Sequence, residues 1–102
     1  MPNAGPVRLS EYLGHTYHPD CDYIEGVLQE RNAGEISHSE AQTKLTVYAC
    51  IHFHGFWTGV EVQVQVKADR FRIPDVTIMR GAQPSGRIIT TPPEVAVEVP
   101  FA

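Results

Sequence analysis

Two carboxylates within apolar, β-rich runs are the residues best suited to do chemistry in this chain. Asp75 follows Pro74 in the run 71–79, and Glu98 lies in the run 95–99. A buried carboxylate is unfavourable unless another group compensates its charge. Two carboxylates on neighbouring strands can share a divalent cation, and oxygen ligands suit Mg²⁺ or Mn²⁺. We therefore expect Asp75 and Glu98 to hold such a cation, which would orient a water and stabilise charge on a phosphate.

Two more residues are candidates for the same site. Glu25 lies in a predicted strand just before Gly26, and His38 lies at the start of a predicted helix. One cluster of Glu25, His38, Asp75 and Glu98 is then expected. A purely structural interpretation fits the spacing equally well, because Asp after Pro is common in turns and a Glu near a chain end is often solvated.

The elements that would position these residues follow from caps and periodicity. Ser37 and Glu40 match a capping box, which predicts a helix from about residue 38 to residue 54 with His38 at the edge of its buried face. The alternating valines of the run 60–67 predict a strand with one buried face. Further predicted elements are a short helix, a strand with a bulge or tight hairpin at its Gly, and two more strands, at residues 7–13, 22–31, 71–79 and 95–99. This order predicts an α/β (α+β) core.

Length and composition limit the classes of protein. A chain of 102 residues is one small domain, expected over residues 7–102 after a loose lead at 1–6. The net charge of -4 argues against a protein that coats DNA, although an enzyme with a local site is still compatible with it. No apolar run reaches the length of a membrane span, and the start does not resemble a signal peptide. The two cysteines are expected to be free thiols of a cytoplasmic protein.

A zinc site is the second metal interpretation that we considered. His15, His18 and Cys21 are spaced by three residues. Pro19 breaks any helix that would align them, and no fourth ligand follows at the spacing of a zinc finger. We therefore do not expect a small zinc protein, nor a redox protein built on Cys21 and Cys50.

Four segments, taken in order, carry a resemblance that covers nearly all of the chain after about Ser10. They are 23–26 (YIEG), 34–39 (GEISHS), 72–76 (RIPDV) and 95–99 (VAVEV). In this order the chain resembles the Uma2 family of the PD-(D/E)XK nuclease superfamily. The resemblance implies a restriction-endonuclease-like core, with a mixed β-sheet and a long helix packed on it. It also implies Mg²⁺- or Mn²⁺-dependent hydrolysis of DNA in a bacterium, with metal-binding acids at Asp75 and Glu98 and further catalytic positions at Glu25 and His38.

The chain departs from this family pattern after Glu98. The superfamily places a water-activating lysine two residues after the glutamate, where this chain has Pro100. Uma2 relatives continue into a loop, a helix and further strands, whereas this sequence ends at Ala102. We therefore expect a C-terminally truncated member, whose exposed last strand favours self-association as a homodimer. Lys44 is a candidate for the basic residue, with no pattern to assign it that role.

Two functions fit these observations. The first is a metal-dependent endonuclease that hydrolyses phosphodiester bonds of DNA, with Asp75 and Glu98 at the cation. The alternative is a non-catalytic remnant of such an enzyme, or a module of the same fold that binds DNA or a protein. The sequence does not distinguish DNA from RNA or indicate sequence specificity.

Overall fold

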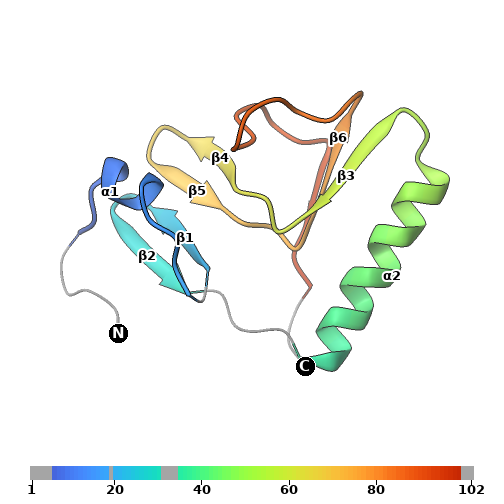
Figure 1. Ribbon diagram of the computed structural model, residues 1–102, viewed down its shortest axis with the longest axis horizontal. Coiled ribbons are helices and arrows are strands. Elements are labelled where there is room, and N and C mark those ends of the chain that lie inside the picture. The colour runs from blue at the N-terminus through green and yellow to red at the C-terminus, as the bar shows by residue number, and fades with distance from the viewer. Residues whose placement is uncertain (1–5, 19, 31–34, 100–102) are drawn as a thin grey trace.

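The computed structural model describes residues 6–18, 20–30 and 35–99. Two helices and seven strands follow one another in this part of the chain (Figure 1): α1 (Leu9–Leu13), β1 (Cys21–Ile24), β2 (Val27–Glu30), α2 (Ile36–His52), β3 (Phe56–Val60), β4 (Val64–Lys67), β5 (Arg70–Arg72), β6 (Val76–Arg80) and β7 (Val95–Val97). The predicted α+β class is confirmed. The loose lead expected at residues 1–6 lies outside the described residues except for Pro6.

The strands form two antiparallel sheets, where one mixed sheet was expected. The first sheet has the order β2-β1-β5-β4, and the second has the order β3-β6-β7. Figure 1 shows α2 alongside the second sheet and α1 over the hairpin of β1 and β2. The chain passes between the sheets through α2 and again at the β3–β4 and β5–β6 connections. These two short connections position the residues at the boundary between the sheets.

The first sheet is built on a tight hairpin and an aromatic core. Glu25 and Gly26 both have positive φ, 50° and 92°, as a two-residue hairpin turn requires. The hairpin alternative at this glycine is therefore confirmed. Tyr12 and Tyr23 stack at 4.8 Å between ring centroids and pack against Phe71. The Tyr12 hydroxyl donates to the carbonyl of Cys21 at 2.8 Å, so the buried phenol is hydrogen-bonded.

The second sheet packs one face on α2. The contacting apolar side chains come from the middle of the helix and from β3, β6 and β7: Leu45, Ala49, Phe56, Val76, Ile78 and Val97. The helix begins at Ile36, earlier than expected, and its N-cap residue Glu35 makes no side-chain capping bond. The predicted capping box is therefore wrong, because Ser37 and Glu40 both lie inside the helix. Its end at His52 is two residues earlier than predicted.

Two of the predicted strands are each divided between the sheets. The run 60–67 breaks at Glu61, which has a φ of 52°, so Val60 ends β3 and Val64 begins β4. The run 71–79 breaks at residues 73–75, because β5 ends at Arg72 and β6 begins at Val76. Pro74 lacks an N–H donor and therefore suits a connection better than a strand interior. Strand β3 was not predicted as a separate element.

The last strand lies at an open edge of the second sheet. Val95 in β7 is 44% exposed, while Val97 and Val99 are half-buried. The expected partial exposure of these valines is confirmed. The register pairs Val76 with Val97 and Ile78 with Val95, which brings the end of β7 beside the start of β6.

Candidate active site

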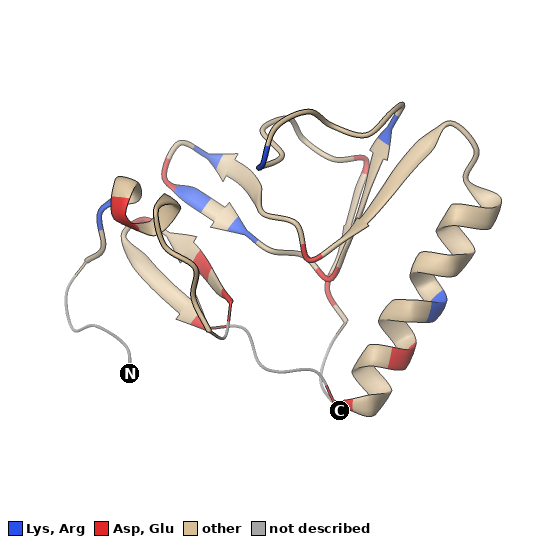
Figure 2. Cartoon of the chain, in the orientation of Figure 1, with Lys and Arg blue, Asp and Glu red and all other residues tan. Residues whose placement is uncertain are grey.

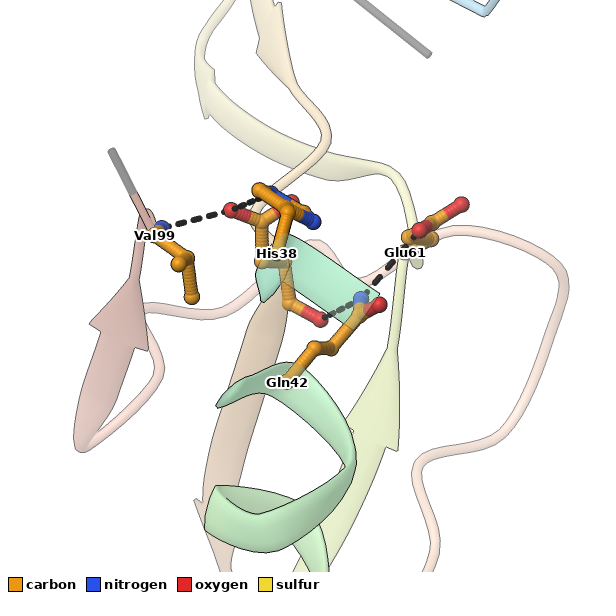
Figure 3. A network of polar contacts seen from close by, with 5 residues as sticks. His38, Gln42, Glu61 and Val99 are labelled. Carbon is orange, nitrogen blue, oxygen red and sulfur yellow. Dashed lines mark hydrogen bonds and ion pairs between the residues drawn. The ribbon is translucent and has the colours of Figure 1, made fainter. Parts of the chain in front are cut away.

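A buried carboxylate with two hydrogen-bond donors lies just before β6 (Figure 3). Asp75 is 2% exposed, and its Oδ2 accepts from the backbone N–H of Val99 at 2.6 Å and lies 3.2 Å from Nε2 of His38. With Asp75 as a carboxylate, Nε2 of His38 is the donor in this contact. The Asp75 N–H in turn donates to the carbonyl of Val97 at 2.9 Å. The structure thus brings His38 and Asp75 together, as the sequence predicts, and fixes both to the end of β7.

Gln42 ties the same point to α2 and to the β3–β4 connection. Its side-chain Nε2 donates to the backbone carbonyl of Asp75 at 2.8 Å and to Oε2 of Glu61 at 3.2 Å. Gln42 follows His38 by four residues, so the two side chains lie on one face of the helix. Neither Gln42 nor Glu61 was predicted from the sequence. The helix spacing could have revealed Gln42, and the pairing of Val60 with Val76 puts Glu61 next to Asp75.

Glu98 lies beside this network at the sheet edge. Extending the pairing of Val76 with Val97 by one position places Glu98 across from Asp75. The residue is exposed, and it lines a groove of about 380 Å³ together with Pro74 and Ala96. The next residue, Val99, supplies the N–H that binds Asp75. The two predicted metal-binding acids are therefore neighbours along adjacent strands.

Glu25 lies in a different place from these residues. Its carboxylate forms ion pairs with Lys67 and Arg70, each at 2.8 Å, at the hairpin turn of the first sheet. The hydrogen bond and charge of Lys67, followed by those of Arg70, lower the pKa of Glu25. These contacts hold Glu25 to β4 and β5. Glu25 therefore lies with Lys67 and Arg70 in the first sheet, whereas His38 lies with Asp75.

Comparisons with known proteins identify the family of this chain. The profile of the Uma2 family, described as "Putative restriction endonuclease", matches residues 9–100. The chain belongs to the Uma2 family. A crystal structure from Anabaena variabilis, described as a "putative nuclease belonging to DUF820", superposes with a TM-score of 0.75 at 19% sequence identity. The match covers 91% of this chain and 57% of that one, so this chain spans little more than half of its structural neighbour. None of the curated proteins compared with the chain matches it.

The acids of this Uma2 chain fit a divalent cation only as an open site. Among the described residues, no group of three or more His, Cys, Asp or Glu side chains is arranged to hold a metal, either at Asp75 or around His15 and Cys21. Cys21 and Cys50 form no disulfide bond, as predicted. Mg²⁺ is often bound by one or two carboxylates, with waters and substrate phosphates completing its shell. Asp75 and Glu98 offer that donor set, so the acids present are compatible with Mg²⁺ or Mn²⁺.

The basic residues of this Uma2 chain lie mostly away from Asp75 and Glu98. Figure 2 shows Lys and Arg mainly on β4, β5 and the far end of β6, with acidic positions at the β3–β4 connection and at the start of β6. Lys44 is exposed on α2 and pairs with Glu40 at 3.1 Å. Lys67 is bound to Glu25. Both described lysines therefore pair with acids other than Asp75 and Glu98.

Among the described helices, none combines the length and the apolar character that a membrane span needs.

Proposed function

We propose that this chain carries the metal-binding part of an endonuclease that hydrolyses phosphodiester bonds of DNA with Mg²⁺ or Mn²⁺. The observation that carries the proposal is the buried carboxylate of Asp75, held between His38 and the Val99 amide beside Glu98. A carboxylate fixed by two donors at a sheet boundary keeps a defined geometry. The membership of the Uma2 family supports a nuclease activity for this geometry.

Each residue has a distinct part in this proposal. Asp75 and Glu98 would hold the cation, which when bound supplies Lewis acidity and an activated water. His38 and the Val99 amide keep the Asp75 carboxylate in one orientation. Gln42 fixes the backbone at Asp75 through the carbonyl oxygen. Contacts that orient a metal-binding carboxylate in this way commonly change metal affinity or activity by about 10–100-fold.

The charge around Asp75 explains why a cation is needed. Glu61, Asp75 and Glu98 are all acidic, and the register of β3, β6 and β7 sets them in neighbouring positions. A phosphodiester is also an anion, so these acids repel it unless a cation intervenes. Activity should therefore disappear in EDTA and return with Mg²⁺ or Mn²⁺.

Cleavage of plasmid and linear duplex DNA by matched variants tests the proposal. Asp75→Asn and Glu98→Gln each remove one proposed ligand while keeping the side-chain volume. Glu94→Gln is the control, because Glu94 pairs with Arg80 at an exposed site. We expect the two ligand variants to lose at least about 100-fold in rate, and the control to cleave like the unchanged chain. Equal rates in all four proteins would refute the proposed site.

A non-catalytic nucleic-acid-binding module is the second candidate. Lys44 and Lys67 pair with Glu40 and Glu25 away from Asp75. This arrangement favours a non-catalytic module, because neither lysine is then placed to activate a water at Asp75. In that case DNA would bind without being cut, and Asp75→Asn would leave the affinity unchanged. Competition between DNA and RNA of equal sequence would show which nucleic acid is preferred under either function.

A further inference from the structure

A polar cavity of about 340 Å³ adjoins the candidate active site. Its walls come from the α1–β1 connection, the β3–β4 connection and the long loop before β7. Glu61 lines the cavity and accepts from Gln42, the residue that also bonds to the Asp75 carbonyl. Ile73 also lines the cavity and precedes Asp75 by two residues. A ligand group in this cavity would therefore lie next to a phosphate bound at Asp75.

An aromatic stack leads into this cavity. Tyr23 stacks on Tyr12, and Tyr12 stacks on Tyr17 with centroids 5.8 Å apart and planes 18° from parallel. Tyr12 is 1% exposed, whereas Tyr17 is half-buried and lines the cavity with it. Tyr17 is thus the outermost tyrosine of a stack anchored in the core, and the His15 ring, which also lines the cavity, lies 6.0 Å from it at an angle of 34°. A planar ligand ring in the cavity can contact this fixed tyrosine, and base–aromatic stacking contributes roughly 1–3 kcal/mol per base.

The polar groups around the cavity select the kind of ring. The carboxylates of Asp20 and Glu61 are acceptors, and Arg87 and the His15 imidazole are the basic groups among the lining residues. Arg87 also donates to the carbonyl of Leu13 at 3.4 Å, which holds it at the rim. Two carboxylates disfavour an anionic group inside the cavity, but they accept hydrogen bonds from the exocyclic amino groups of bases. The lining therefore suits a neutral planar ring with amino groups, joined to a phosphate chain that Arg87 can meet outside.

We propose that this cavity binds one unpaired base with an exocyclic amino group, which means cytosine, adenine or guanine, from the strand held at Asp75. The volume lies within the range of small-molecule sites, about 300–1,000 Å³. Enzymes that read a single base in this way take it out of the stack or act on single strands. The position of the scissile phosphate in this proposal rests on the proposed nuclease function, whereas binding of the base itself does not.

Binding in EDTA separates the two ideas, because without the cation the acids weaken binding of every strand alike, and the strands differ only in the base at one position. Short single-stranded DNAs that differ at one position, cytosine, uracil or an abasic site, are titrated by fluorescence anisotropy. Replacement of Tyr17 by alanine should weaken binding of the cytosine strand by about 5- to 150-fold, and Tyr17→Phe should retain it. Tyr48→Ala is the matched control, since Tyr48 is 54% exposed on α2, and its effect should stay within about twofold. Glu61→Gln should reduce the preference for cytosine over uracil.

The wild-type chain alone decides the proposal if Tyr17→Ala does not fold. Equal affinity for the cytosine and abasic strands would overturn it, as would equal affinity of folded Tyr17→Ala and Tyr48→Ala proteins. Loss of the base preference together with Asp75-dependent cleavage would refute the cavity and leave the nuclease function standing. A base preference in a protein that never cuts would support the cavity and refute the nuclease function.

Discussion

Replacement of Asp75 by alanine should destabilise the fold as well as remove the proposed site. The change deletes the acceptor of the Val99 amide at 2.6 Å and of His38 at 3.2 Å, in a position that is 2% exposed. Hydrogen bonds to a charged group contribute about 1.5–3 kcal/mol each, and the longer bond belongs at the lower end. Desolvation of the wild-type carboxylate offsets part of this gain. We therefore expect a loss of roughly 2–4 kcal/mol in the free energy of unfolding.

Urea unfolding measures this loss through the midpoint, provided that the slope stays constant. For a domain of this size the same loss lowers Tm by roughly 10–30 °C. Asp75→Asn keeps one acceptor and should lose about half as much free energy. A double-mutant cycle with His38→Ala isolates the pair, for which we expect a coupling of about 1 kcal/mol. An Asp75→Ala protein as stable as the wild type, or a coupling of zero, would refute the hydrogen-bonding scheme.

Three further predictions test other parts of the structure. Gly59→Ala would place a Cβ 2.3 Å from the Trp57 ring, so it should lower the free energy of unfolding by about 1–3 kcal/mol, and an unchanged Tm would contradict the packing of β3. Exposed Cys50 should react with iodoacetamide in the native protein, while Cys21, which is 6% exposed and whose pKa is raised by burial, should react only after unfolding; equal labelling by mass spectrometry would show otherwise. Glu25 has a lowered pKa beside its two cationic partners, so its contribution to stability is present above the unfolded-state pKa and is lost as the pH falls through the folded-state pKa. Thermal unfolding of Glu25→Gln should therefore converge with the wild type in acid, and a difference that grows there would contradict this.

The helix and hairpin could be predicted from sequence because their signals are local. The spacing that predicts α2 puts His38 near the buried face, and the Gly26 turn follows from the need for positive φ. The break at Glu61 has no such signal, since valines alternate on both sides of it. A positive φ at a residue other than glycine is uncommon. The alternating valines therefore predicted one continuous strand, whereas these residues are divided between two sheets.

The candidate site was only partly predictable for a related reason. Asp75 and Glu98 became candidates because carboxylates in apolar strands are unusual. Gln42 and Glu61 were missed because a glutamine on a helix and a glutamate among valines are ordinary surface residues. Their roles depend on the crossing between the sheets, which is a long-range feature. The ion pairs of Glu25 depend on the pairing of β1 with β5, which its own segment does not encode.

Titration of Mn²⁺ against thermal unfolding tests most directly whether Asp75 and Glu98 hold a cation. A ligand that binds only the native state adds about 2.7 kcal/mol at 100 times its Kd, which corresponds to a rise in Tm of roughly 10–20 °C for this chain length. We expect this rise in the wild type and in Glu94→Gln, and its absence in Asp75→Asn and Glu98→Gln, with each shift measured against the same protein in EDTA. No rise in the wild type, or an equal rise in all four proteins, would contradict the central claim.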